Sequence, residues 1–142
     1  MRRPTNPTSL IAAIIALAAC AAEPTAPRQS APVGARFTLA PGQMATIRET
    51  GLTLMFVRVV SESRCPSNPH VQCIWEGTAR LQLRIDGAGS PKVVPIETQL
   101  GASTATVDGY MIRLLSLSPG PTTEAAIPPE RYRATFEVVR EN

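Results

Sequence analysis

The sequence predicts an all-β fold, an antiparallel β-sandwich of about eight short strands, with an immunoglobulin-like arrangement or a small barrel as alternatives. Three observations lead to this prediction. Apolar and polar residues alternate with a period of two, and turn-forming residues separate the alternating runs. Beyond the N-terminal segment, no run shows the 3.6-residue apolar period of an amphipathic helix.

The clearest alternation occurs in residues 79–85 and 132–138, where every second residue is apolar, as in half-buried strands. Weaker strands are predicted at residues 37–39, 44–47, 54–60, 92–97, 104–107 and 110–117. The strand at 92–97 contains Pro95, which lacks a backbone donor and is tolerated mainly at sheet edges. Asp108 and Gly109 form a good two-residue hairpin turn, so the flanking strands should be neighbours.

The N-terminal segment has the architecture of an export signal. Arg2 and Arg3 precede an apolar run at residues 10–19 that ends in small residues. As a helix, this run would span about 15 Å, roughly half of a bilayer core, so a permanent transmembrane anchor is disfavoured. We expect residues 1–19 to direct export and to be removed.

The end of the signal, Leu17-Ala18-Ala19-Cys20, resembles the lipobox of bacterial lipoproteins. The resemblance implies that the sulfur of Cys20 carries a diacylglycerol, that cleavage occurs before Cys20, and that the new amino terminus is acylated. Several acyl chains make membrane attachment effectively permanent. An ordinary secretory signal is the alternative. Because Ala21, and not Asp, follows the lipidated position, the outer membrane facing the periplasm is the expected location.

Residues 20–35 are rich in Ala and Pro and contain almost no large apolar residue, so we predict a semi-extended tether there and a β domain at residues 36–142. Removing Arg2 and Arg3 from the 14 basic residues leaves 12, against 11 acidic residues. The mature chain is therefore nearly neutral. It has no dense basic cluster and few aromatic residues, so no nucleic-acid partner is expected.

With Cys20 lipidated, Cys65 and Cys73 remain, and an oxidising envelope compartment favours a disulfide between them. Closing this nine-residue loop would lower the conformational entropy of the unfolded chain and so stabilise the folded state by about 2.5 kcal/mol. Pro66 and Pro69 fix two φ angles, so the loop should be stiff.

The role of this loop is open at the sequence level. It could bind a protein, for example as a protease inhibitor does, with Ser67, Asn68 and His70 as candidate contacts. It could instead only secure a crossover between two sheets. A soft-metal site built from Cys65, Cys73 and His70 is a weaker alternative, because oxidation removes both thiolates and the chain has no second His. We therefore expect no bound metal and no cofactor.

No nucleophile motif or paired acid and base is recognisable, so the sequence does not predict an enzyme. The broad expectation is a membrane-anchored envelope lipoprotein with a structural or accessory β domain, and a protein-binding module is the alternative.

The stretch Ser63-Arg64-Cys65-Pro66, followed by Val71-Gln72-Cys73-Ile74-Trp75-Glu76-Gly77, resembles a motif in small, largely uncharacterised bacterial envelope proteins. Those proteins share an S-R-C-P loop, then V-x-C-x-W-x-G leading into a strand, and a last strand near a Tyr such as Tyr132. This chain departs from the pattern at Glu62, where Asp is usual, at Glu76, where a small residue is usual, and in a longer span between its cysteines. The resemblance supports the disulfide and the fold class and implies no catalytic or ligand residue. We expect the side chain of Trp75 to be buried in the core beneath the loop.

Overall fold

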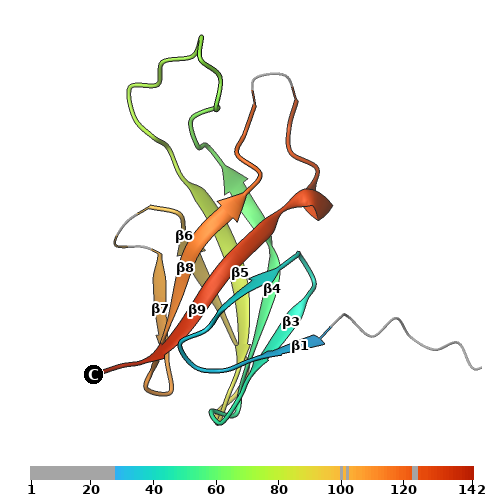
Figure 1. Cartoon of the computed structure of the whole chain (residues 1–142), viewed down its shortest axis with the longest axis vertical. Helices are drawn as coiled ribbons and strands as arrows, with labels where there is room; N and C mark the ends of the chain where they lie inside the picture. The colour runs from blue at the N-terminus through green and yellow to red at the C-terminus, as the bar shows by residue number, and fades with distance from the viewer. Residues whose placement is uncertain (1–27, 100, 102, 123–124) are drawn as a thin grey trace, which may run out of the picture.

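The computed structural model of the chain describes residues 28–99, 101, 103–122 and 125–142, which form two β-sheets packed face to face (Figure 1). One sheet has the order β1-β3-β4-β5-β6, with β1 at Arg28–Ala31, β3 at Met44–Ile47, β4 at Leu52–Glu62, β5 at Ala79–Asp86 and β6 at Lys92–Glu97. The other has the order β2-β9-β8-β7, with β2 at Arg36–Leu39, β9 at Arg133–Arg140, β8 at Tyr110–Ser118 and β7 at Thr104–Val107. The predicted sandwich is confirmed, and the strands do not close into a barrel.

All eight predicted strands are present, each with bounds within two residues of those expected from the alternation. Pro95 lies in β6, which is an edge strand as predicted, because a central strand would need the donor that proline lacks. Asp108 and Gly109 connect β7 to β8, with φ angles of 51° and 76°. Two successive positive φ angles are the geometry of a type I′ hairpin turn.

The strand β1 was not predicted, and it lies inside the segment whose composition indicated a tether. It pairs in parallel with β3, and the side chain of Gln29 donates to the backbone carbonyl of Thr38 in β2 at 2.7 Å. Only Ala31 of β1 is buried, so the strand is held by backbone bonds and has no apolar alternation to reveal it. The β domain therefore begins no later than Arg28, and of the expected tether only residues 20–27 lie outside the described part.

The core lies between the two sheets and is built mainly from aliphatic side chains. In β5 every second residue, from Ala79 to Ile85, is buried, as the period of two requires. All three phenylalanines of the chain meet there. The rings of Phe37 and Phe56 lie 6.1 and 6.4 Å from that of Phe136, so the scarce aromatic area is concentrated at one place where the sheets face each other.

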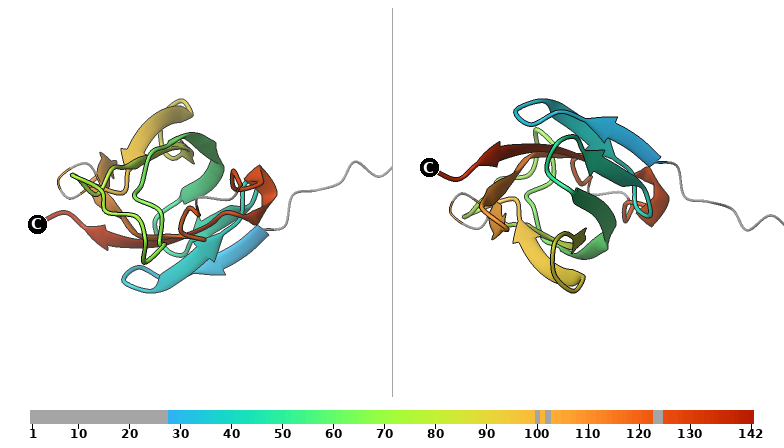
Figure 2. Two further views of the ribbon diagram at one scale, coloured as in Figure 1. Left: turned by 90° about the horizontal axis from the view of Figure 1, so that it is seen from above. Right: turned by 90° about the horizontal axis from the view of Figure 1, so that it is seen from below.

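Two connections project from one end of the sandwich, the one between β4 and β5 and the one between β8 and β9, while the C-terminus lies at the opposite end (Figure 1). Seen from above, the β4–β5 connection extends across the end of the two sheets (Figure 2). A short 3₁₀ helix at Pro129–Arg131 leads from the second connection into β9. The cysteine motif of the sequence occupies the first connection.

Candidate binding site: the stapled loop

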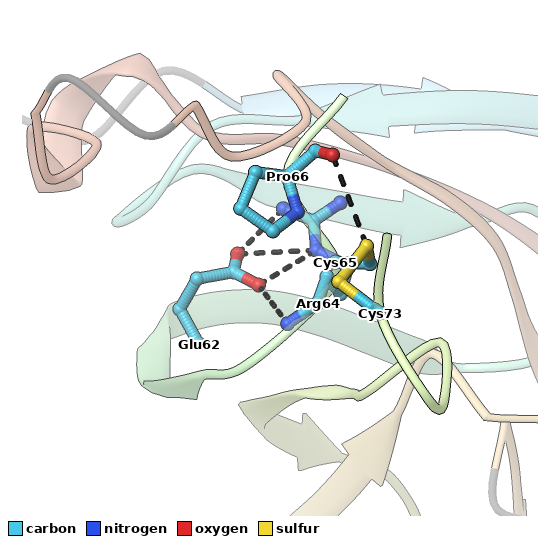
Figure 3. The surroundings of a disulfide bond; sticks show 5 residues. All are labelled: Glu62, Arg64, Cys65, Pro66 and Cys73. Atoms are coloured by element: carbon cyan, nitrogen blue, oxygen red, sulfur yellow. Dashed lines mark hydrogen bonds and ion pairs between the residues drawn. A yellow bond between two sulfur atoms is a disulfide. The ribbon is translucent and has the colours of Figure 1, made fainter. Parts of the chain in front are cut away.

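Residues 63–78, which we call the stapled loop, contain the predicted disulfide. Cys65 and Cys73 are bonded, with their Cα atoms 6.0 Å apart (Figure 3). Cys65 is half-buried and Cys73 is exposed. Because the two sulfurs are bonded to each other, neither is a thiolate that could bind a metal ion in this state.

The base of the stapled loop continues the ladder between β4 and β5. The backbone N–H of Ser63 donates to the carbonyl of Thr78 at 2.9 Å, and the backbone N–H of Thr78 donates to the hydroxyl of Ser63 at 3.2 Å. One step further, the N–H of Cys65 donates to the carbonyl of Glu76 at 2.7 Å. The disulfide is therefore attached directly to a hydrogen-bonded ladder and not to a free loop.

Gly77 allows the two sides of this ladder to approach. Its φ angle is +65°, which side chains rarely tolerate, and a Cβ atom there would lie 1.8 Å from the carbonyl oxygen of Ser63. The glycine of the W-x-G motif is thus required by both conformation and space.

Arg64 braces the stapled loop against both sheets. Its guanidinium forms a two-point ion pair with Glu62 at the end of β4, with Nε 2.8 Å from Oε1 and Nη2 2.5 Å from Oε2. It also donates to the backbone carbonyls of Leu117, at 2.6 Å, and Pro119, at 2.9 Å, in and just after β8. The S-R-C-P motif therefore contains the residue that joins the loop, the first sheet and the second sheet. Figure 3 shows its ion pair with Glu62 beside the disulfide.

The carboxylate of Glu62 has a further partner, the hydroxyl of Tyr132, which donates to it at 3.2 Å. Partial burial by itself raises the pKa of Glu62, but the hydrogen bonds and charge of Arg64, with the bond from Tyr132, outweigh it, and the pKa lies below the usual value. Burial, followed by the negative charge of Glu62, raises the pKa of Tyr132. Both groups favour the state in which Glu62 is ionised and Tyr132 is neutral.

Two of the three candidate contacts make hydrogen bonds within the protein, and Ser67, which is exposed, does so through its backbone N–H. The N–H of Ser67 donates to the carbonyl of Pro121 at 3.1 Å, which ties the tip to the β8–β9 connection. The side-chain oxygen of Asn68 accepts from the backbone N–H of His70 at 2.9 Å, and the backbone carbonyl of Asn68 accepts from the N–H of Val71 at 3.0 Å. This is a local turn. The side chain of His70 is exposed.

The expectation for Trp75 was wrong. It is 82% exposed, and Ile74 beside it is fully exposed. The buried residues of β5 begin at Ala79, its first residue, and Trp75 lies four residues before it in the chain, outside every strand of the described residues. The two largest exposed apolar side chains of the loop are therefore neighbours, directly after Cys73.

The absence of charged residues around Ile74 and Trp75 could have indicated from the sequence that this part of the loop is a contact surface. From residue 65 to residue 75 the chain contains no Asp, Glu, Lys or Arg, and His70 is the only basic side chain. An apolar pair next to the second cysteine, in a stretch without charged residues, is unusual for a fully solvated turn, because exposed apolar clusters mark contact surfaces.

A surface hollow lies beside the stapled loop, lined by Trp75, Gly77 and Thr78 and, after the end of β6, by Thr98 and Gln99. A second hollow lies between the loop and the β8–β9 connection, with Glu62 and Tyr132 among its lining residues. In the described residues, no three His, Cys, Asp or Glu side chains are grouped as metal ligands.

Comparison with protein-family models, curated proteins and solved structures found no match to this chain. Within the described ranges, no helix has the length and apolar character needed to cross a membrane. The lipobox around Cys20 lies outside the described residues. The fold and the site define the chain as a β-sandwich domain with a braced, disulfide-stapled loop at one end.

Proposed function

We propose that this protein is a lipid-anchored envelope lipoprotein whose β-sandwich is a non-catalytic binding module, with Ile74 and Trp75 of the stapled loop as its recognition surface for a protein of the envelope. Cys20 would attach the chain to the outer membrane on its periplasmic side, and the sandwich would hold the loop in place.

The observation that supports binding is the exposure of Ile74 and Trp75 on a segment that is already rigid. The disulfide, the ladder at the base and the contacts of Arg64 all restrict the loop before any partner arrives. A preorganised loop loses less conformational entropy on binding. Burying a Trp side chain removes roughly 150–250 Å² from water, so one such residue can dominate an interface.

A purely structural role is the second candidate, and the contacts of Arg64 favour it. They join the end of β4 to the end of β8, so the motif also closes the sandwich at that end. That role explains Ser63, Arg64 and Gly77 but gives no reason for exposed Ile74 and Trp75. A metal-binding loop would need the disulfide to be reduced.

Site-specific photo-crosslinking in cells tests the proposal. A photoreactive residue at position 74 is compared with one at Val93, which is also exposed and apolar but lies on β6. We expect a protein adduct from position 74 only, and its loss when Cys65 and Cys73 are both replaced by Ser. Equal adducts at both positions, or none at 74, would exclude the loop as the recognition surface.

The anchor is tested separately by fractionation and intact mass. The wild-type chain should begin at Cys20, carry lipid and remain with the outer membrane, whereas Cys20→Ala should leave it without the lipid. A wild-type protein that is recovered without lipid would refute the anchor and leave the binding surface to be judged by the crosslinking.

A further inference from the structure

The positions of Ile74 and Trp75 depend on the disulfide. In the part of the chain that the structure describes, residues 72–75 make no hydrogen bond. On one side, this segment is fixed by the bond between the sulfurs of Cys65 and Cys73. On the other side, it is fixed at Glu76, whose carbonyl accepts from the N–H of Cys65. The two apolar side chains therefore lie on a short bridge between two fixed residues.

The base of the stapled loop, in contrast, is held without either sulfur. Ser63 and Thr78 are joined by backbone and side-chain hydrogen bonds. Arg64 pairs with Glu62 and donates to a carbonyl in β8. Opening the disulfide would leave these contacts in place and would remove the fixed point at position 73. The sandwich and its brace would remain, and the segment that carries Ile74 and Trp75 would be loosened.

The disulfide is also accessible from solvent. Cys73 is exposed, and both cysteines line a surface hollow together with Ile74 and Trp75. Residues 66–75 contain no Asp or Glu that would repel an incoming thiolate. Thiol–disulfide exchange depends on access of a thiolate to one of the two sulfurs. Because Cys65 is half-buried, Cys73 is the more accessible partner.

We propose that the Cys65–Cys73 disulfide is a redox switch for the recognition surface, opened by a dithiol protein of the envelope. This inference rests on the proposed function and adds the regulation of the same surface. In the oxidised state the surface is formed, and in the reduced state it is disordered.

The exchange takes place in two steps. A thiolate of the dithiol attacks the Sγ of Cys73, the bond to Cys65 breaks, and Cys65 leaves as a thiolate that takes up a proton. The second thiol of the dithiol then loses its proton and attacks the dithiol's own sulfur in the mixed disulfide, which releases Cys73 as a thiolate that is protonated in turn. The chain gains two electrons and two protons, and the dithiol is oxidised to a disulfide.

Reduction lengthens the segment that a partner has to order. In the oxidised chain, only Ile74 and Trp75 lie between the fixed residues Cys73 and Glu76. In the reduced chain, the nearest preceding residue with a hydrogen bond is Val71, whose N–H bonds within a local turn. Because ordering flexible residues opposes binding, the reduced chain should bind its partner more weakly.

Trp75 is the only Trp of the chain, so its fluorescence reports directly on this segment. The test follows the time-resolved fluorescence anisotropy of the full-length protein before and after dithiothreitol, with far-UV circular dichroism as the measure of folding. One control combines Trp75→Phe with Val93→Trp, which moves the reporter to an exposed position on β6. Another combines Cys65→Ser with Cys73→Ser, which removes the disulfide permanently.

We expect the rate of reduction to rise in proportion to the dithiothreitol concentration and to lie within about tenfold of the rate for the urea-unfolded protein. The amplitude of fast motion of Trp75 should roughly double on reduction and return on reoxidation with oxidised glutathione, while the circular dichroism stays constant. The reporter at position 93 should not change. The double Ser variant should show the motion of the reduced chain with and without dithiothreitol.

Three results would overturn the inference. One is reduction at a rate that is independent of the dithiothreitol concentration, because the disulfide would then open only after global unfolding. Another is a Trp75 that is equally ordered in both states. The third is loss of the β-sheet signal, or mobility at position 93, on reduction. These measurements use no partner, so the switch can fail while an adduct from position 74 stands, and a missing adduct would not alter the measured order of Trp75.

Discussion

Replacing Gly77 by Ala tests whether the close approach at the base of the stapled loop has the energetic importance that the geometry implies. The new Cβ would lie 1.8 Å from the carbonyl oxygen of Ser63, so the two strands must separate by more than 1 Å to reach ordinary contact. That movement breaks the bonds between Ser63 and Thr78, each worth about 0.5–1.5 kcal/mol. The positive φ adds about 1–2 kcal/mol. We expect Gly77→Ala to lower the free energy of unfolding by about 3–5 kcal/mol.

Two other glycines separate these contributions. Gly42 has a φ of +81° and nothing within 4 Å of its Cβ position, so Gly42→Ala should show the conformational cost alone, about 1–2 kcal/mol. Gly89 has neither a positive φ nor a close neighbour, so Gly89→Ala should be neutral or slightly stabilising. Urea denaturation of the three variants measures the differences. If Gly77→Ala were no less stable than Gly42→Ala, the steric argument would be wrong.

Four further predictions concern the disulfide, Glu62, Tyr132 and the core. Replacing Cys65 and Cys73 together by Ser should lower the free energy of unfolding by about 2.5 kcal/mol in the chain-entropy model, measured by urea denaturation without reductant; an unchanged midpoint would contradict this. The folded-state pKa of Glu62 is lowered, so the stability that its ionised form contributes is present above the ordinary Glu pKa and is lost as the pH falls through the folded-state pKa. The thermal unfolding midpoint of Glu62→Gln should therefore depend less on pH in the acidic range than that of the wild type. The pKa of Tyr132 is raised, so the stability that its neutral hydroxyl contributes is present below the ordinary Tyr pKa and is lost as the pH rises through the folded-state pKa. Tyr132→Phe should not show this loss of stability at alkaline pH. Phe136→Ala should cost about 3–5 kcal/mol, because it removes the ring that contacts both other phenylalanines, and a cost below 1 kcal/mol in urea would show that the core is packed elsewhere.

Most of the fold could be predicted because the signals that carry it are local. A strand with one buried face needs apolar residues at every second position, and β5 and β9 show this pattern directly in the sequence. The hairpin between β7 and β8 needs two positive φ angles, which Asp108 and Gly109 accept. Neither requirement depends on residues far away in the chain.

The missed features depend on distant partners. β1 has one buried residue, Ala31, and is held by backbone bonds to β3, so its own side chains do not identify it as a strand. The exposure of Trp75 depends on whether a distant element covers it, and the absence of charged residues from 65 to 75 is the only local sign of it in the sequence. Similarly, the backbone N–H of Ser67 donates to the carbonyl of Pro121, a distant partner that the sequence around position 67 does not indicate.

The sequence by itself determined the class of fold, the strand positions, the hairpin turn and the cysteine pair, because period, turn chemistry and the cysteine count are properties of short segments. The tertiary structure alone decided that Arg64 joins two sheets, that Gly77 lies against Ser63, and that Ile74 and Trp75 face solvent. These features arise where segments distant in the chain meet. Their energies come from contacts and solvent exclusion between elements, which the local order of residues does not encode.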